Sequence, residues 1–222
     1  MNTTDMYDHP KVYRSDREGI EAAISCIERG GITILPADTV YAIFARVDLP
    51  ETVERVYNMK KRERRKPFVI YTNKEKVNDV AALNGVARTL INQVWPQALS
   101  LILPKKKTIP DWFTQNLQTV AVLTARNSVI TEVTKRISAP IFGTSVNVSG
   151  EPEVKTAAEI LPFIDHVDLF VADDAIPIYN EASTMVDCTI DPPKIARLTC
   201  LSLDYLKGII PNIEIEFSRK IS

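Results

Sequence analysis

The chain has 222 residues, of which 45% are hydrophobic and 25% are charged, and its formal net charge is −1. A chain of this length can bury a sizeable core without disulfides or metal ions, and this composition is typical of a globular protein. The near-neutral charge argues against a protein that coats nucleic acid, so any site that binds an anion must be local.

The numbers of cysteines and histidines indicate the cellular compartment and whether the protein could bind a metal ion. Cys26, Cys188 and Cys200 show no C-x-x-C spacing, and an odd number of cysteines fits a reducing compartment better than a disulfide scaffold. His9 and His166 are the only histidines in the sequence, and so few potential ligands argue against a zinc site. The N-terminus lacks the apolar segment of a secretory signal, and no apolar run has the length of a membrane span. We therefore predict a cytoplasmic protein with no metal ligands of its own.

The expected elements follow in chain order. Residues 1–14 form an accessory segment, and a capping box at 15–18 starts a helix that Gly30 and Gly31 end. The continuous apolar run 32–35 predicts a strand covered on both faces. The remaining expected elements are a strand at 42–47, a helix from Pro50, a strand at 67–71, a capping box at 72–75, a helix at 86–94, strands at 99–103 and 119–123, a helix at 129–137, a strand at 141–144, a helix at 157–163, strands at 167–171, 185–190 and 194–198, and a helix from Leu203.

The order of these elements predicts the fold class. Strands alternate with helices over the first two-thirds of the chain and cluster near its end, which favours one α/β domain with a mixed parallel and antiparallel sheet. We assign this domain to residues 15–200 and treat 201–222 as a C-terminal extension.

A dense block of cations follows the expected helix from Pro50. Six of the seven residues from Lys60 to Lys66 are basic. Guanidinium groups match phosphate oxygens with a planar fork, and lysine adds a mobile charge, so the block could hold a triphosphate. A solvated charged face is the alternative, and the block alone does not decide between them.

Small polar residues follow several expected strands. Thr39 comes after the first apolar strand, Ser145 and Asn147 follow the strand at 141–144, and Ser183 precedes the strand at 185–190. Loops at strand ends commonly line ligand crevices in α/β sheets, whereas ordinary polar turns are the alternative for each residue. Arg197 lies in an otherwise apolar strand and requires a partner, either a ligand or a structural carboxylate.

Together these segments resemble the YrdC family, the threonylcarbamoyl-AMP synthases, over roughly residues 20–198. Each motif is short, and their common order carries the resemblance. The motifs are Pro36-Ala-Asp-Thr-Val-Tyr41, Lys60-x-Arg62-x-x-x-Lys66-Pro67, Trp95-Pro96 with Leu99-Ser100, Thr119-Val-Ala-Val122, Ser145-Val-Asn147-Val-Ser-Gly150, Ser183-Thr184-Met-Val-Asp187 and Arg197.

The resemblance implies a twisted mixed sheet with flanking helices and a concave basic cavity. It implies a nucleotidyltransferase that makes threonylcarbamoyl-AMP from L-threonine, bicarbonate and ATP, with Mg²⁺ on the ATP phosphates. A partner transferase would then modify tRNA, and no membrane partner is expected. By the resemblance, Lys60 and Arg62 are catalytic, the ATP-binding residues are Lys60, Arg62, Lys66, Thr119, Ser145, Asn147 and Arg197, and the substrate-binding residues are Thr39, Tyr71 and Ser183.

The chain departs from the family pattern at the position after Val122. Leu123 stands where the family has an arginine that pairs with the threonine carboxylate, and leucine cannot supply a charge-assisted bond. A second hypothesis is therefore a carbamoyl-adenylate-forming enzyme with a different amine substrate. A third is a non-catalytic RNA-binding module that uses Lys60–Lys66 and Lys105–Lys107.

Overall fold

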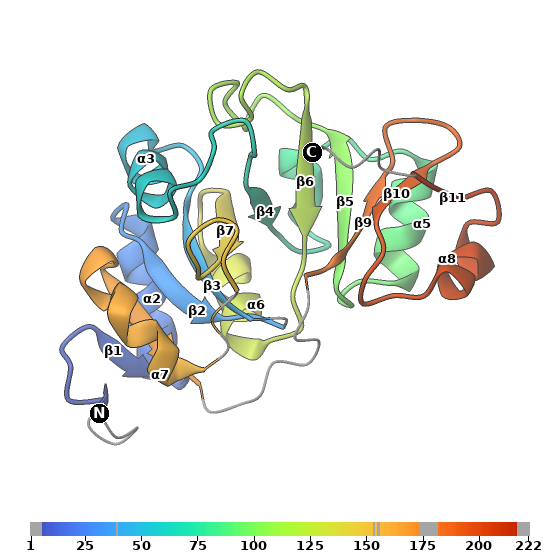
Figure 1. Ribbon diagram of the computed structural model, residues 1–222. Coiled ribbons are helices and arrows are strands. Elements are labelled where there is room, and N and C mark those ends of the chain that lie inside the picture. Colours follow the sequence, from blue (N-terminus) through green and yellow to red (C-terminus); the bar gives the residue numbers. More distant parts are fainter. Residues whose placement is uncertain (1–5, 39, 153, 155, 174–181, 217–222) are drawn as a thin grey trace.

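The computed structural model describes residues 6–38, 40–152, 154, 156–173 and 182–216. These residues form one sheet with helices packed against it (Figure 1). No helix in the described part of the chain is long and apolar enough to cross a membrane.

The sheet has eleven strands, and its order differs from the chain order. From one edge to the other the order is β1-β8-β2-β3-β7-β4-β6-β5-β9-β10-β11. The strands are β1 (Val12–Arg14), β2 (Thr33–Pro36), β3 (Tyr41–Arg46), β4 (Val69–Tyr71), β5 (Leu99–Pro104), β6 (Thr119–Leu123), β7 (Ile141–Ser145), β8 (Leu169–Ala172), β9 (Thr184–Asp187), β10 (Lys194–Arg197) and β11 (Glu214–Ile215).

The pairing is both parallel and antiparallel. The β2–β3, β3–β7, β4–β7, β5–β6 and β9–β10 pairs are antiparallel. The β1–β8, β2–β8, β4–β6, β5–β9 and β10–β11 pairs are parallel. The predicted α/β fold with a mixed sheet is confirmed.

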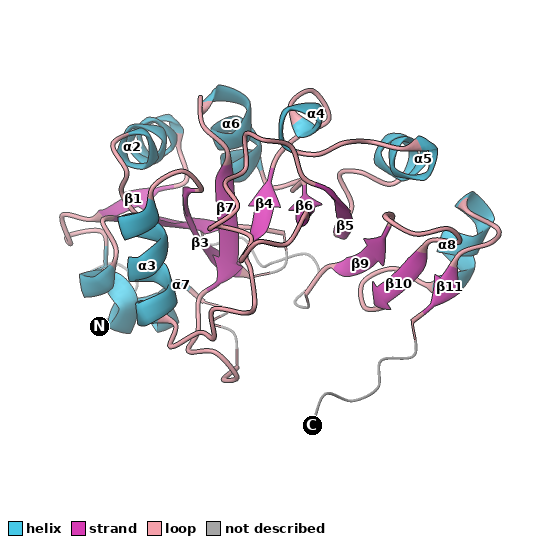
Figure 2. Ribbon diagram, turned by 90° about the horizontal axis from the view of Figure 1, so that it is seen from above, coloured by secondary structure: helices cyan, strands magenta, loops and turns pink. Residues whose placement is uncertain are grey.

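The helices lie on both sides of the sheet. In Figure 2, α2 and α6 lie together on one side of the part containing β2 and β3, and α3 lies on the other. The helices are α2 (Arg17–Glu28), α3 (Pro50–Met59), α4 (Val77–Val80), α5 (Gly85–Gln93), α6 (Ser128–Arg136), α7 (Ala157–Ile160), the 3₁₀ helix η1 (Leu161–His166) and α8 (Leu203–Ile209).

Two apolar clusters fill the space between the sheet and its helices. Along β3, Ile43 faces one cluster, while Ala42 and Phe44 face the other, beneath α2 and α6. Successive side chains of a strand point to opposite faces, so a strand covered on both sides is apolar throughout. The continuously apolar β2 and β3 therefore belong to the centre of the sheet.

Two predicted helix caps are wrong. The first helix begins at Arg17, and the side chain of Asp16, one residue after the predicted Ser15 cap, accepts from Gly19 N at 3.0 Å. The segment 72–75 caps no helix, because α4 begins at Val77. Short polar side chains that follow one another compete for the same cap, and the sequence does not determine which of them wins.

Both terminal segments contribute to the sheet. Strand β1 pairs with β8, although it falls within the accessory segment 1–14. In the extension 201–222, α8 contacts α5, β11 pairs with β10, and Leu206 and Ile213 are buried in the larger apolar cluster. As far as they are described, both segments add edge strands to the domain predicted at 15–200.

Candidate functional site

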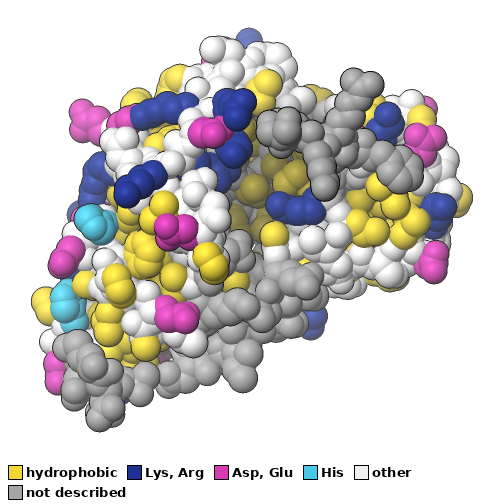
Figure 3. Space-filling view, viewed as in Figure 1, with side chains coloured by type: hydrophobic (Ala, Val, Ile, Leu, Met, Phe, Trp, Pro, Cys, Tyr) yellow, Lys and Arg dark blue, Asp and Glu magenta, His cyan; other side chains and the backbone are white. Residues whose placement is uncertain are grey.

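A cavity of about 240 Å³ lies against the middle of the sheet. It is bordered by parts of β3, β4, β6 and β7, by the loop after α3, and by residues next to β9 and β10. Figure 3 shows a face of the molecule that is hollowed near its centre, with apolar side chains deep inside and Lys and Arg side chains around it. The lining residues are Val40, Ala42, Arg62, Phe68, Val69, Tyr71, Leu123, Gly143, Thr144, Ser145, Ala182, Ser183 and Arg197.

The floor of the cavity consists of short side chains on paired strands. Ala42 of β3 is opposite Ser145 of β7, and Gly143 of β7 is opposite Val69 of β4. A Cβ atom on Gly143 would lie 2.4 Å from the Tyr71 ring, so any larger residue here would force that ring to move. The space therefore depends on small residues in the strands, including Ala42 and Gly143.

The basic block after α3 divides into inward and outward residues. Lys60 has an exposed fraction of only 1%. Its Nζ donates to Asn147 O at 3.0 Å, to Asn147 Oδ1 at 2.8 Å and to Ser145 O. Its own carbonyl accepts from Ser149 N at 2.8 Å. Lys60 thus holds the turn after β7 from both its backbone and its side chain, and it is not among the residues that line the cavity.

Arg62 is the cation of the block that lines the cavity. Its Nε donates to Lys66 O at 2.8 Å and its Nη2 to Pro67 O at 3.2 Å, while its guanidinium lies over the Phe68 ring. Burial lowers the pKa of Arg62 from its usual value, an effect that Tyr57 opposes. A guanidinium remains charged well above neutral pH, so a fixed positive charge faces the cavity.

Three other cations of the block pair with acidic side chains at the surface. Arg64 contacts Glu54, and both Arg65 and Lys66 contact Glu63. Lys66 is exposed and does not line the cavity. The solvated-face hypothesis therefore describes these residues, and the ligand hypothesis fits Arg62.

Ser145 and Asn147 lie at the end of β7. Ser145 lines the cavity, and its Oγ donates to Asn147 Oδ1 at 2.8 Å. The Asn147 amide donates to Glu151 O at 2.8 Å, which fixes the orientation of the side chain. Together with Lys60, Asn147 organises the turn, while Ser145 presents its hydroxyl at the wall.

Ser183 and Arg197 form the opposite part of the wall. Arg197 Nε donates to Ser183 O at 2.8 Å, and Nη2 lies 3.4 Å from Ser183 Oγ. Arg197 had been expected in a buried strand but is exposed at the end of β10. Its guanidinium is anchored to Ser183 and lines the cavity.

Tyr71 and Leu123 complete the wall between β4 and β6. The two residues are cross-strand partners, and the Tyr71 ring packs edge-on against Phe44 at 4.8 Å between centroids. Leu123 is 8% exposed and presents an apolar surface. Thr119 begins the same strand, four residues away, and does not line the cavity. Thr39 lies outside the described residues.

Asp38, in the loop after β2, is a buried carboxylate within the motif that begins at Pro36. It is 6% exposed, and its carboxylate accepts from Arg126 N and Asn127 N, each at 2.6 Å. Burial raises the pKa of Asp38, and these hydrogen bonds oppose the shift. The contact ties the loop after β2 to the start of α6, and only its position after an apolar strand could have indicated it.

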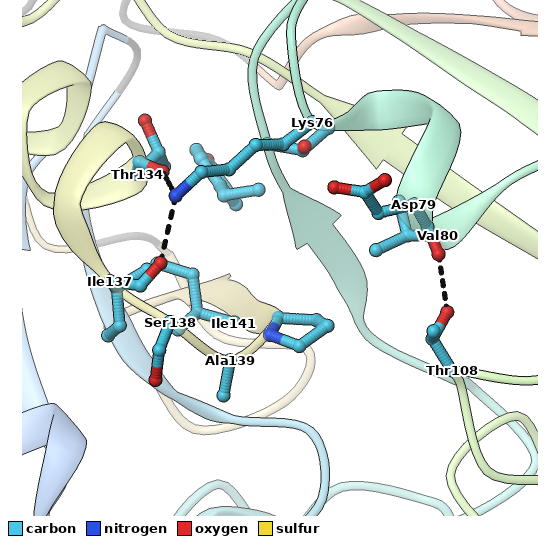
Figure 4. Close-up of a pocket in the computed structure, with 12 residues that line it drawn as sticks. Lys76, Asp79, Val80, Thr108, Thr134, Ile137, Ser138, Ala139 and Ile141 are labelled. Atoms are coloured by element: carbon cyan, nitrogen blue, oxygen red, sulfur yellow. Dashed lines mark hydrogen bonds between the residues drawn. The ribbon is translucent and has the colours of Figure 1, made fainter.

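A second cavity of about 150 Å³ lies at the carboxyl end of α6 (Figure 4). The Lys76 side chain extends along its wall, and its Nζ donates to Thr134 O at 3.1 Å and Ile137 O at 2.9 Å. This cation therefore satisfies helix-terminal carbonyls. Asp79 and Thr108 are on the opposite side. The first cavity, with Arg62 and Arg197, is the better candidate for an anionic ligand.

Comparison with known proteins identifies the family of this chain. The model of the Sua5, YciO and YrdC proteins, which carries the description "Telomere recombination", matches residues 25–199. This chain belongs to the Sua5/YciO/YrdC family. The matched region begins in α2 and extends past β10, so it contains every element that lines the first cavity.

Individual members of the Sua5/YciO/YrdC family show how far the similarity extends. The threonylcarbamoyl-AMP synthase of Pseudoalteromonas translucida is 28% identical over 178 residues, which are 78% of this chain and 95% of that protein. The crystal structure of Pyrococcus abyssi Sua5 complexed with L-threonine is 27% identical, with a TM-score of 0.85 over 92% of this chain. This chain spans 61% of that Sua5 chain. E. coli YciO, at 19% identity and a TM-score of 0.76, shares the fold.

Proposed function

We propose that this protein is a nucleotidyltransferase that synthesises threonylcarbamoyl-AMP from L-threonine, bicarbonate and ATP. The observation that carries the proposal is the convergence of Arg62, Ser145, Ser183 and Arg197 on one cavity from four separate segments. The names of the curated relatives, threonylcarbamoyl-AMP synthases of several organisms, support it. The threonine complex of the P. abyssi protein supports the amino-acid substrate.

The proposed chemistry has two steps. The amine of threonine combines with bicarbonate, with loss of water, to give a carbamate. A carbamate oxygen then attacks the α-phosphorus of ATP, the bond to the bridging oxygen breaks, and pyrophosphate leaves with the electron pair. Two anions meet in the second step, so its barrier falls chiefly through positioning and positive charge.

The cavity residues have matching roles in this proposal. Arg62 and Arg197 place positive charge against the phosphates, and Ser145 and Ser183 present polar hydroxyl oxygens to the ligand. Tyr71 bounds the amino-acid side of the space. Lys60 acts by holding the turn that carries Ser145 and Asn147.

Three further assignments rest on the family resemblance. Lys66 and Thr119 are proposed contacts for parts of ATP outside the cavity lining, and Thr39 is a proposed contact for the amino acid. Mg²⁺ would be held by the ATP phosphates, since no carboxylate is among the described residues that line the cavity. A threonylcarbamoyl transferase acting on tRNA is the proposed consumer of the product.

A second candidate keeps the reaction and changes the amine. Leu123 lines the cavity with an apolar surface, where a substrate carboxylate gains no charge-assisted bond. An amine without a carboxylate would fit this wall.

One assay separates the two candidates. Pyrophosphate release is followed with ATP, Mg²⁺ and bicarbonate while the amine is varied over amino acids and simple alkyl amines. The first candidate predicts release that requires both threonine and bicarbonate. Release with another amine and none with threonine would establish the second candidate instead.

A further inference from the structure

Ser100 lies in the buried part of the sheet and contacts a residue of the cavity wall. It is a residue of β5 with an exposed fraction of 0%, and it does not line the cavity. Its Oγ lies 2.6 Å from Ser183 Oγ. Strands β5 and β9 are parallel neighbours, which brings Ser100 beside the residue that precedes β9.

Ser183 is in turn hydrogen-bonded to Arg197. Arg197 Nε donates to Ser183 O at 2.8 Å, and Nη2 lies 3.4 Å from Ser183 Oγ. Ser100, Ser183 and Arg197 thus form a row from the buried sheet to the cavity. Only Ser183 and Arg197 line the cavity, so the hydroxyl of Ser100 acts on a ligand through Ser183 and not by direct contact.

Hydroxyl chemistry lets Ser183 bond to both of its neighbours at once. A serine hydroxyl has one hydrogen to donate and two lone pairs that accept. Ser183 Oγ can therefore accept from the Arg197 guanidinium while it shares a hydrogen bond with Ser100 Oγ, in which either oxygen can be the donor. Loss of the Ser100 hydroxyl would remove one hydrogen bond that fixes the Ser183 hydroxyl, and it would thereby loosen the partner of Arg197.

We propose that Ser100 is a positioning residue, which fixes the Ser183 hydroxyl and through it the guanidinium of Arg197 at the cavity wall. The expected effect on ATP binding rests on the proposed function. The positioning of Ser183 and Arg197 by Ser100 is a property of the protein without ligand. Groups that are held in place before a ligand arrives bind it with a smaller loss of conformational freedom.

The test compares Ser100→Ala with a matched control. Thr33→Val removes another fully buried strand hydroxyl, one that donates to Phe44 O in a different part of the sheet. The ATP dissociation constant is measured by calorimetry with Mg²⁺, and thermal unfolding confirms that each variant is folded. We expect Ser100→Ala to weaken ATP binding by roughly 2- to 12-fold, the effect of one hydrogen bond, and Thr33→Val to leave it unchanged.

A double variant tests whether the effect passes through Ser183. In a Ser183→Ala background, Ser100→Ala should weaken ATP binding no further, because the row is already broken. Additive losses, or unchanged binding in Ser100→Ala alone, would overturn the proposal. Ser100→Thr retains the hydroxyl and should recover most of the affinity.

A measurement without ligand keeps this proposal distinct from the proposed function. The Arg197 Nε–H signal is observed by NMR of ¹⁵N-arginine-labelled protein and assigned by its loss in Arg197→Lys. We expect Ser100→Ala to shift this signal and to speed its exchange with water, with no change in Thr33→Val. If the wild type failed to bind ATP, the proposed function would fail, and the NMR comparison would still decide the role of Ser100. An unchanged signal in Ser100→Ala would exclude the positioning role.

Discussion

Lys60 Nζ lies 2.8 Å from Oδ1 of Asn147, 87 residues along the chain, and the lysine is almost completely shielded from solvent. The ammonium also donates to the carbonyls of Ser145 and Asn147. The first cation of the basic block therefore holds the turn that follows β7, and the site depends on this contact before any ligand binds.

Replacing Lys60 should destabilise the protein as well as impair binding. Lys60→Met removes three hydrogen bonds of the ammonium group, and we expect a loss of about 3 kcal/mol in the free energy of unfolding in urea. Weaker ATP binding should accompany it because the turn that carries Ser145 loses its support. Lys61→Met, at the exposed neighbouring position, should change stability little. A Lys60→Met variant as stable as the wild type would contradict the structural role.

Arg62 and Arg64 offer a direct comparison within one loop. Arg62 lines the cavity, whereas Arg64 pairs with Glu54 at the surface. We expect Arg62→Ala to weaken ATP binding by roughly 10- to 150-fold, the effect of charge-assisted hydrogen bonds, and Arg64→Ala to leave it nearly unchanged. Calorimetry with ATP and Mg²⁺ measures both. Equal losses in the two variants would indicate a diffuse basic surface, and salt-dependent RNA binding without ATP binding would favour the RNA-binding module.

Gly143 should tolerate no side chain beside Tyr71. In Gly143→Ala the new Cβ would lie 2.4 Å from Tyr71 Cε2 and 2.8 Å from Phe44 Cε1, so rings on both sides must move. We expect a loss of about 1–3 kcal/mol in the free energy of unfolding, with altered cavity shape. Gly85→Ala, where nothing lies within 4 Å of the added atom, is the matched control and should not be destabilising. Similar unfolding midpoints for the two variants would show that Tyr71 relaxes freely.

Two buried thiols should make stability fall in alkali. Burial raises the pKa of Cys26 from 9.0 to about 11 and that of Cys188 from 9.0 to about 12. The folded state favours the neutral thiols, so their contribution is fully present below pH 9 and is lost as the pH rises toward the folded values. At pH 10 each thiol should cost about 1.4 kcal/mol relative to neutral pH.

The matched variants for this effect are Cys26→Ala and Cys188→Ala. Each should show a shallower fall in the free energy of unfolding between pH 8 and pH 11 than the wild type, measured in urea at a series of pH values. Cys200→Ala serves as the control, because Cys200 is only partly buried. Parallel pH profiles in all four proteins would exclude titration of the buried thiols as the cause.

Local patterns in the sequence predicted the elements well where one signal dominated. Strand β6 begins at Thr119 and ends at Leu123, as predicted. Apolar residues between polar loops define a buried strand through local sequence alone. The helix at Pro50 likewise begins where proline favours a first turn. Helix caps were less predictable. Ser15 and Asp16 can both cap the first helix with a side-chain oxygen, and tertiary packing selects between them.

Contacts between distant segments set the site, and these were harder to predict. The sequence grouped Lys60, Arg62 and Lys66 as one unit, yet they face three environments: a buried turn, the cavity and the surface. The direction of each side chain depends on how the loop leaves α3. Asp38 and Ser100 act through partners 88 and 83 residues away, which the order of strands in the sheet brings together. No local pattern encodes that order.

The most direct test of the account follows carbon from bicarbonate into the product. The protein is incubated with ATP, Mg²⁺, L-threonine and ¹³C-bicarbonate, and the nucleotides are analysed by mass spectrometry. The account predicts a species with the mass of threonylcarbamoyl-AMP that carries one ¹³C atom, formed by the wild type and by Arg64→Ala but not by Arg62→Ala combined with Arg197→Ala. Absence of this species from the wild type, or its undiminished formation by the double variant, would contradict the proposed reaction at this cavity.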